Sequence, residues 1–234
     1  MAQRITINDS PVTTRRTVRT AIAALMGLAI LTGLPGCQIG ALIGGMAESY
    51  KRESTHSIPA QYTGLTGKSF AVIVVADRSI DATYPGVVQL LSTKITERLH
   101  EFGAAKGFIT SADMMAFIYN NPRWSVRPRI DLAKELGVDR LVVVELQEYR
   151  LHDPGNQYLW DGAAIGTIGV IESDSPTPEN YVFEKLVTVK FPDKQGTGPL
   201  EYSQNLMMAA LDKRFTDRAT WLFYTHEEPY YPDY

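Results

Sequence analysis

The apolar positions between residues 68 and 226 recur at spacings that predict alternating strands and helices. Phe70–Ala76 is a continuous apolar run, which is typical of a strand covered on both faces. From Val88 to Phe102 the apolar residues recur at helical spacing, and Gly103 is suited to end the helix that this spacing indicates. We therefore expect a buried strand followed by a long amphipathic helix.

The chain after residue 103 predicts four further strands and three further helices. The strands are expected at 108–109, 141–146, 163–171 and 181–191, and the helices at 111–119, 130–136 and 201–223. The last strand alternates apolar and polar residues, which indicates a sheet with one side in solvent. This order predicts an α/β or α+β fold, with a mixed sheet of about five strands in one domain of two or three layers. An amphipathic helix ends the domain.

The N-terminal region has the layout of an export signal. A basic start is followed by an apolar run, Ala21–Leu34, whose length of about fourteen residues falls short of the roughly 20 of a membrane-spanning helix. The run ends in Leu34-Pro35-Gly36-Cys37, which resembles the lipobox of bacterial lipoproteins. The resemblance implies recognition of Leu34 and Gly36, cleavage before Cys37, and a covalent lipid on the Cys37 thiol. An uncleaved membrane anchor is the alternative.

The lipid would determine where the protein works. A lipoprotein cysteine carries two or three acyl chains, and stable anchoring needs more than one. Gln38 stands where an Asp would resemble the inner-membrane retention pattern, so we expect an outer-membrane lipoprotein that faces the periplasm. The expected segments are a signal peptide at 1–36, a lipidated flexible tether at 37–67, the α/β domain at 68–226 and a Pro/Tyr-rich tail at 227–234.

Charge and cysteine content narrow the function further. Residues 1–36 carry four arginines and one aspartate, so their removal takes the formal charge from −3 to −6. A net acidic, exported protein is a poor candidate for binding nucleic acid. Cys37 is the only cysteine, so once it is lipidated no disulfide, cysteine nucleophile or cysteine metal site remains.

A second resemblance comes from Ile130–Leu146, where a short helix ends in Leu-Gly-Val-Asp and leads directly into a strand of branched residues. With the elements before it, this pattern resembles a group of envelope lipoproteins and periplasmic domains over about residues 68–150. The group includes the penicillin-binding-protein activator lipoproteins, the curli secretion-channel lipoprotein and the amino-terminal domain of the TolB protein. The resemblance implies a non-enzymatic lipoprotein that binds or assembles with envelope partners, and it transfers no catalytic residue.

The glycine-rich stretches predict no cofactor site. Gly64–Ser69 is similar to the end of a phosphate-binding loop, but it lacks the first glycine of that motif and precedes a strand instead of a helix. Gly162, Gly166 and Gly169 lie within a predicted strand with no helix behind it, where close backbone approach accounts for them. The four histidines show no metal-ligand spacing, so no metal is expected either.

The acidic residues predict no catalytic pair. The loop Asp77–Tyr84 follows the first strand, where ligands of open α/β sheets gather, so it is the best small-molecule site if the domain has one. Capping of a turn is the alternative reading of this loop. His152-Asp153 is either half of an acid–base pair or a solvated turn. Glu145 and Glu148 are expected on opposite faces of a strand, so they should not pair.

Two aromatic segments are candidate partner contacts. The first is a basic loop with a tryptophan, and its residues are Arg123, Trp124, Arg127 and Arg129. Tryptophan and arginine are favoured anchors of protein interfaces. The alternative is a tryptophan packed on the core with solvated arginines. Tyr230 and Tyr231 in the tail pose the same choice.

These observations favour an exported, lipid-anchored envelope protein that acts as a non-enzymatic binding or assembly module. The first alternative is an oligomeric subunit of an envelope secretion channel, because strands 163–171 and 181–191 have about the 9–11 residues of a barrel strand. The second alternative is an envelope hydrolase, for which the sequence offers no nucleophile elbow, metal spacing or paired carboxylates. The expected partners are the membrane, through the lipid, and an envelope protein.

Overall fold

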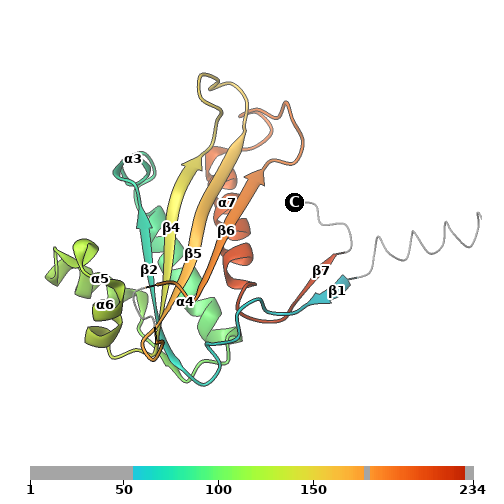
Figure 1. Ribbon diagram of the computed structural model, residues 1–234. Coiled ribbons are helices and arrows are strands. Elements are labelled where there is room, and N and C mark those ends of the chain that lie inside the picture. The colour runs from blue at the N-terminus through green and yellow to red at the C-terminus, as the bar shows by residue number, and fades with distance from the viewer. Residues whose placement is uncertain (1–54, 177–179, 230–234) are drawn as a thin grey trace, which may run out of the picture. The chain divides into compact units, whose positions relative to one another are not determined.

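A five-stranded mixed sheet with the order β3-β2-β4-β5-β6 lies at the centre of the computed structural model (Figure 1). The structure describes residues 55–176 and 180–229. The strands are β1 Thr55–Ile58, β2 Ser69–Ala76, β3 Gly107–Phe108, β4 Arg140–Arg150, β5 Gly162–Glu172, β6 Phe183–Phe191 and β7 His226–Pro229. The helices are α3 Arg78–Thr83, α4 Val87–Phe102, α5 Ser111–Asn120, the 3₁₀ turn η1 Trp124–Val126, α6 Arg129–Leu136 and α7 Gln204–Thr220.

The sheet has a parallel and an antiparallel half. β2 pairs in parallel with both β3 and β4, whereas β4, β5 and β6 follow one another as antiparallel strands. The parallel half needs the crossover helices α4, α5 and α6, and the antiparallel half needs only loops. The predicted mixed α/β fold, with its long helix after the first strand and its C-terminal helix, is confirmed.

One face of the sheet is covered by α4 and α7, and the main core lies there (Figure 1). α4 buries Leu91 and Ile95, and α7 buries Leu211 and Phe215, at the helical spacing that the sequence shows. A Cβ on Gly166 of β5 would lie 2.9 Å from the Phe215 ring. Gly162 and Gly166 therefore allow the close approach that the sequence predicted, here between the sheet and α7, whereas a Cβ on Gly169 would meet the Tyr181 ring.

The opposite face, which we call the open face, is covered only in part. α5 and α6 pack on the first half of β2 and β4, where a second core contains Ile73, Leu141 and Val143. Because β2 contributes alternate residues to both cores, Phe70–Ala76 is covered on both faces, as its continuous apolar run predicted. On this face α6 also reaches Ile171 near the end of β5, whereas no helix of the described chain covers the later part of β4, the earlier part of β5 or β6 (Figure 1).

A second, two-stranded sheet joins the two ends of the described chain. β1 pairs antiparallel with β7, with Thr55 opposite Pro229 and Ile58 opposite His226. These strands lie in segments that the sequence analysis assigned to the flexible tether, 37–67, and to the irregular tail, 227–234. Leu65, also in the predicted tether, is fully buried in the main core. Pairing across the whole length of the domain has no local sequence signal, which is why a tether was expected here.

A β-bulge changes the expected facing of two glutamates. Leu146 pairs with Gly166, but the next paired residue, Glu148, lies opposite Ile165, so Gln147 is an extra residue in β4. The extra residue returns Glu148 to the face of Glu145, and the expectation that they face opposite sides is wrong. They still do not form a carboxylate pair, because Glu145 accepts from Tyr181 and Glu148 accepts from Arg150.

Arg140, at the start of β4, fastens the leading segment to the sheet. Its side chain is 7% exposed and donates to the carbonyl of Gly64 at 3.1 Å and to Asp174 Oδ1 at 2.6 Å. Asp174 also accepts from Lys68, and these two partners hold the pKa of Asp174 at about 2. Glu172 lies 3.4 Å from the guanidinium and accepts from Tyr62. One buried charge thus links the segment before β2 to the β5–β6 connection.

We expect Arg140→Ala to lower the free energy of unfolding by about 3 kcal/mol, because it leaves acceptors without their buried donor. Urea unfolding followed by circular dichroism measures the change. Arg123→Ala, at an exposed position, is the control and should change stability by less than about 0.5 kcal/mol. Equal effects of the two substitutions would contradict the role given to Arg140.

Candidate interaction surface

The outer edge of β6 is a free sheet edge. β6 is the last strand of the sheet and pairs only with β5. A groove of about 610 Å³ follows it, and its lining includes every residue from Lys185 to Lys190. The second wall is formed by the end of α7, with Arg218 and Trp221, and by β1 and β7. This volume is within the roughly 300–1,000 Å³ of ligand-binding pockets.

The direction of the backbone groups along β6 follows from its two ends. The carbonyl of Lys190 accepts from Arg214 Nη1 at 2.5 Å, so it points away from β5. The carbonyl of Phe191 lies 2.7 Å from the position of a Cβ on Gly162 in β5, so it points toward β5. Since antiparallel pairs alternate, Leu186 and Thr188 also direct their backbone N–H and C=O groups outward. Within residues 55–176 and 180–229, no other backbone group pairs with this side of β6.

A stacked cluster fixes the far wall of the groove. The Trp221 and His226 rings are nearly parallel, with centroids 4.5 Å apart, and the guanidinium carbon of Arg218 lies 5.3 Å from the Trp221 centroid. Glu228 Oε1 accepts from Arg218 at 2.6 Å and lies 3.2 Å from His226 Nε2. These contacts hold β7, and through it β1, against the end of α7.

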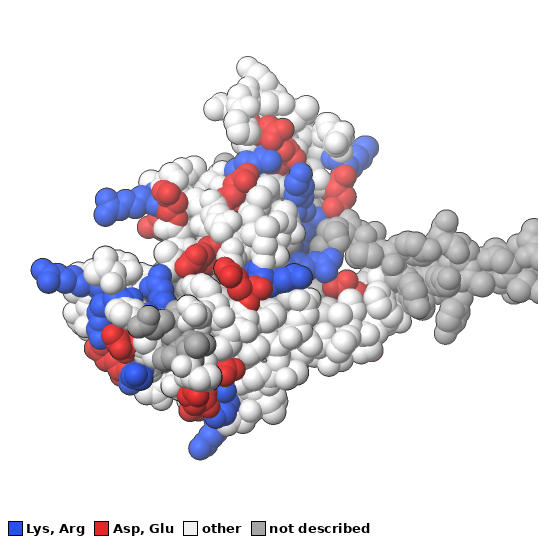
Figure 2. Space-filling model, in the orientation of Figure 1, with Lys and Arg blue, Asp and Glu red and all other residues white. Residues whose placement is uncertain are grey.

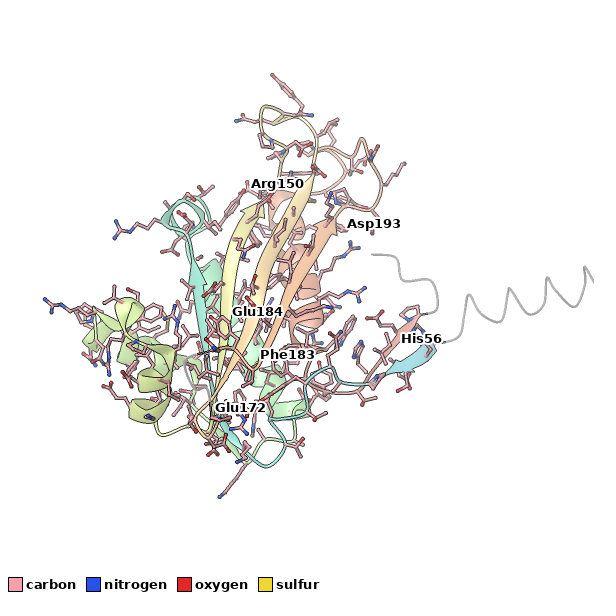
Figure 3. All side chains as sticks on the ribbon, in the orientation of Figure 1. His56, Arg150, Glu172, Phe183, Glu184 and Asp193 are labelled. Atoms are coloured by element: carbon pink, nitrogen blue, oxygen red, sulfur yellow. The ribbon has the colours of Figure 1, made fainter. Side chains whose placement is uncertain are left out.

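Most charges that line the groove are paired within the domain. Arg214 donates to both carboxylate oxygens of Asp193 at 2.7 and 2.6 Å, and Asp193, which follows β6, lines the groove (Figure 3). Arg218 is paired with Glu228. Lys185 and Lys190, which also line the groove, are both exposed, and neither forms an ion pair within the described part of the chain.

The open face beside the groove is also accessible. The side chain of Leu186 is 57% exposed, which is unusual for a leucine in a strand. Figure 2, which looks onto this face, shows acidic and basic side chains interspersed with uncharged surface. Glu145 accepts from Tyr181, and burial, with Glu145 beside it, raises the pKa of Tyr181 to about 12.

The structure gives local partners to most of the predicted contact loop. Trp124 is half-buried against the second core, and the guanidinium carbon of Arg129 lies 5.4 Å from its ring centroid. Arg127 forms a 2.6 Å ion pair with Glu135, and Arg123 is exposed. Partner contact through this loop stays a prediction. The predicted signal and lipidation residues, Leu34, Gly36 and Cys37, and the predicted tail contacts, Tyr230 and Tyr231, lie outside the described residues.

The predicted small-molecule loop contains a short helix. Asp77 Oδ1 accepts from the backbone N–H of Ser79 at 2.9 Å and from its hydroxyl at 3.1 Å, so Asp77 caps α3. These two hydrogen bonds lower the pKa of Asp77. Capping, the alternative reading of Asp77, is thus what the structure shows. The predicted loop Asp77–Tyr84 is helical from Arg78 to Thr83, and this cap satisfies a free N–H group of the first turn.

His152 and Asp153 have separate partners. The His152 ring stacks on Trp160 with centroids 4.4 Å apart, and its Nδ1 lies 2.8 Å from the carbonyl of Leu159. Asp153 forms a 2.9 Å ion pair with Arg150. In the residues that the structure describes, no group of three or more His, Cys, Asp or Glu side chains is placed to hold a metal ion. No helix there is long and apolar enough to cross a membrane.

A buried carboxylate was not foreseen from the sequence. Asp212 on α7 is 2% exposed, and its Oδ1 accepts from the hydroxyl of Tyr149 at 2.8 Å. Burial raises the pKa of Asp212, and burial together with the carboxylate raises the pKa of Tyr149. Asp212 directly follows the apolar Leu211 on the amphipathic helix. The spacing of apolar residues alone therefore does not show that the Asp212 carboxylate is buried.

Comparison with known proteins gives structural similarity at low identity. No family model matches the chain, and no curated protein matches it. A PelC dodecamer from Paraburkholderia phytofirmans is 11% identical with a TM-score of 0.43, over 73% of this chain and 97% of PelC. Lipoprotein GNA1162 from Neisseria meningitidis is 11% identical with a TM-score of 0.43, over 62% of this chain and 93% of GNA1162. The hypothetical protein CT253 from Chlamydia trachomatis is 13% identical with a TM-score of 0.38, over 66% of this chain and 98% of CT253.

We expect Asp212→Asn to remove a pH-dependent loss of stability. Because burial raises the pKa of Asp212 above its value of about 3.9 in the unfolded chain, ionisation destabilises the native state as the pH rises through the native pKa. The variant should therefore gain stability relative to the wild type between pH 4 and pH 7, as measured by urea unfolding at both values. A stability difference that is the same at both pH values would contradict this.

Proposed function

We propose that this chain is a lipid-anchored envelope protein that acts as a non-enzymatic binding module and holds its partner at the β6 edge. The observation that carries the proposal is the groove of about 610 Å³ along a strand whose outward backbone groups at Leu186 and Thr188 have no backbone partner in the described chain. A free edge in a protein that is not aggregated is normally blocked or used, and strand edges are recurrent binding sites for peptides.

The anchor would join the domain beside this groove. Cys37 precedes β1 by 18 positions, and an extended chain spans at most about 3.6 Å per residue, so the domain can reach about 60 Å from the membrane. β1 provides Ile58 to the groove, and β7, its partner, provides His226 and Glu228. The lipid and the binding surface would therefore be connected through one short ribbon.

The proposal contains no catalytic step. The titratable groups that the sequence analysis singled out are engaged in the fold: Asp77 caps α3, and Asp153 pairs with Arg150. Asp212 is enclosed between α7 and Tyr149, away from the groove lining. An assay that found hydrolytic turnover lost on substitution of His152 or Asp153 would favour the hydrolase alternative.

The channel alternative would require a different use of β5 and β6. α7 packs Met207, Leu211 and Phe215 on the inner face of these strands in the main core. A channel built from them would have to give up that packing, whereas a binding module keeps it. A subunit of a channel should also form large rings in detergent, which size-exclusion chromatography with light scattering measures.

We expect Cys37→Ser to abolish incorporation of an alkyne-labelled palmitate and to remove the protein from the outer-membrane fraction of a sucrose gradient. The serine hydroxyl cannot take the thioether-linked lipid that holds the chain in the bilayer. Gln38→Asp is the matched control, since it should keep the label and shift the protein toward the inner membrane. Equal labelling of wild type and Cys37→Ser would refute the lipid anchor.

We expect a photo-crosslinker at Leu186 to capture a discrete envelope protein in intact cells, because this exposed side chain borders the groove. The same group at Leu200, an exposed turn position, should capture nothing, and a probe at Val126 tests the predicted loop contact. Mass spectrometry identifies the product, which should be lost in Cys37→Ser cells. Capture that is equal at Leu186 and Leu200 would oppose the proposed surface.

A further inference from the structure

We infer that the β6 edge binds an extended polypeptide segment of a partner protein as an added strand, with a carboxylate side chain of that segment opposite Lys185. The inference rests on the proposed function and names the chemistry of the partner. Three features of the edge support it: the backbone of β6, the side chains on either side of that strand, and the charge of Lys185.

The backbone of β6 offers a length of edge that suits strand addition. The groove is lined by six consecutive residues, Lys185–Lys190, which span about 20 Å at a rise of roughly 3.3 Å per residue. The carbonyl of Lys190 is already taken by Arg214. The N–H and C=O groups of Leu186 and Thr188 remain, and Glu184 continues the edge toward the start of the strand (Figure 3).

The side chains of β6 define what an added strand should carry. Val187 and Val189 are buried against the main core and also line the groove. Lys185 lies on the same face as these valines but is exposed. Leu186 is exposed on the open face. An added strand therefore suits a carboxylate on the helix side, near Lys185, and an apolar residue on the open face, near Leu186.

The charges favour a polypeptide over a small anion or a lipid headgroup. Arg214 and Arg218 are each engaged by a carboxylate of the domain, Asp193 and Glu228. A phosphate site needs several donors that converge on one point, whereas here Lys185 and Lys190 lie on opposite faces of β6, beside a row of outward backbone groups. Backbone hydrogen bonds supply the affinity of strand addition, and single side chains supply its specificity.

The test uses the full-length mature lipoprotein in detergent and fluorescent ten-residue peptides of alternating valine and glutamate or alternating valine and lysine. Fluorescence anisotropy should show binding of the glutamate peptide and at least about fivefold weaker binding of the lysine peptide. Two further glutamate peptides carry N-methyl groups on either the odd or the even residues. Because only one edge of an added strand faces β6, one of the two should lose binding and the other should keep it.

Variants of the edge separate strand addition from contact by side chains alone. Thr188→Pro removes an outward N–H that β5 does not use, and it should weaken binding of the glutamate peptide by about fivefold. Thr188→Ala keeps this N–H and should bind as the wild type does. Lys185→Glu should reverse the preference between the two peptides, whereas Lys134→Glu, on exposed α6 surface, should not. Thermal melts confirm that each variant is folded.

Equal binding of the two N-methylated peptides, or wild-type binding by a folded Thr188→Pro variant, would overturn strand addition. Failure of the glutamate peptide to bind would overturn it too. Binding that appears only after removal of residues 230–234 would assign the edge to the chain's own tail and overturn the inference of a partner strand. None of these results depends on capture at Leu186 in cells, so the proposed function can stand when this inference falls.

Discussion

The structure depends on how one sheet is covered by a limited amount of helix. α4 and α7 cover the inner face of the five strands apart from the exposed Lys185 of β6, whereas α5 and α6 reach only the first part of β2 and β4 and the end of β5 on the other face. Burial of apolar surface stabilises the sheet at about 25 cal/mol per Å², so the inner face provides most of the stability. As a consequence, the later part of β4, the earlier part of β5 and β6 keep an accessible face, and β6 keeps an accessible edge.

Polar contacts fix the ends of the chain onto this sheet. Arg140 holds the segment before β2 through the carbonyl of Gly64, and the Arg218–Glu228 pair holds β7 against α7. Both arginines are largely buried, where hydrogen-bonded ion pairs act in a lower effective dielectric than at the surface. Between these two points the β1–β7 ribbon forms, and the ribbon provides one wall of the groove. These contacts at both ends of the described residues thus form the surface that we propose for binding.

The same ion pairs simplify the electrostatics of the groove. Pairing of Arg214 with Asp193 and of Arg218 with Glu228 leaves Lys185 and Lys190 as the lining lysines without an ion pair in the described chain, and Lys185 lies on the helix side of β6. We therefore expect the outward backbone groups to contribute more to the proposed recognition than side-chain charge does. This differs from the sequence-based picture, in which the basic loop with Trp124 was the candidate contact, because Trp124 packs on the second core and Arg127 pairs within its own helix region.

The sequence by itself determined the central strands, the long helix after the first strand and the amphipathic final helix, because burial of one or both faces imposes a period on local residues. It also determined the lipobox resemblance at Cys37 and the close packing at Gly166. Only the tertiary structure decided the β1–β7 pairing, the bulge at Gln147, the burial of Asp212 and the groove along β6. Each of these depends on residues far apart in the chain, and a local period reports which face is buried but not which distant segment lies against it.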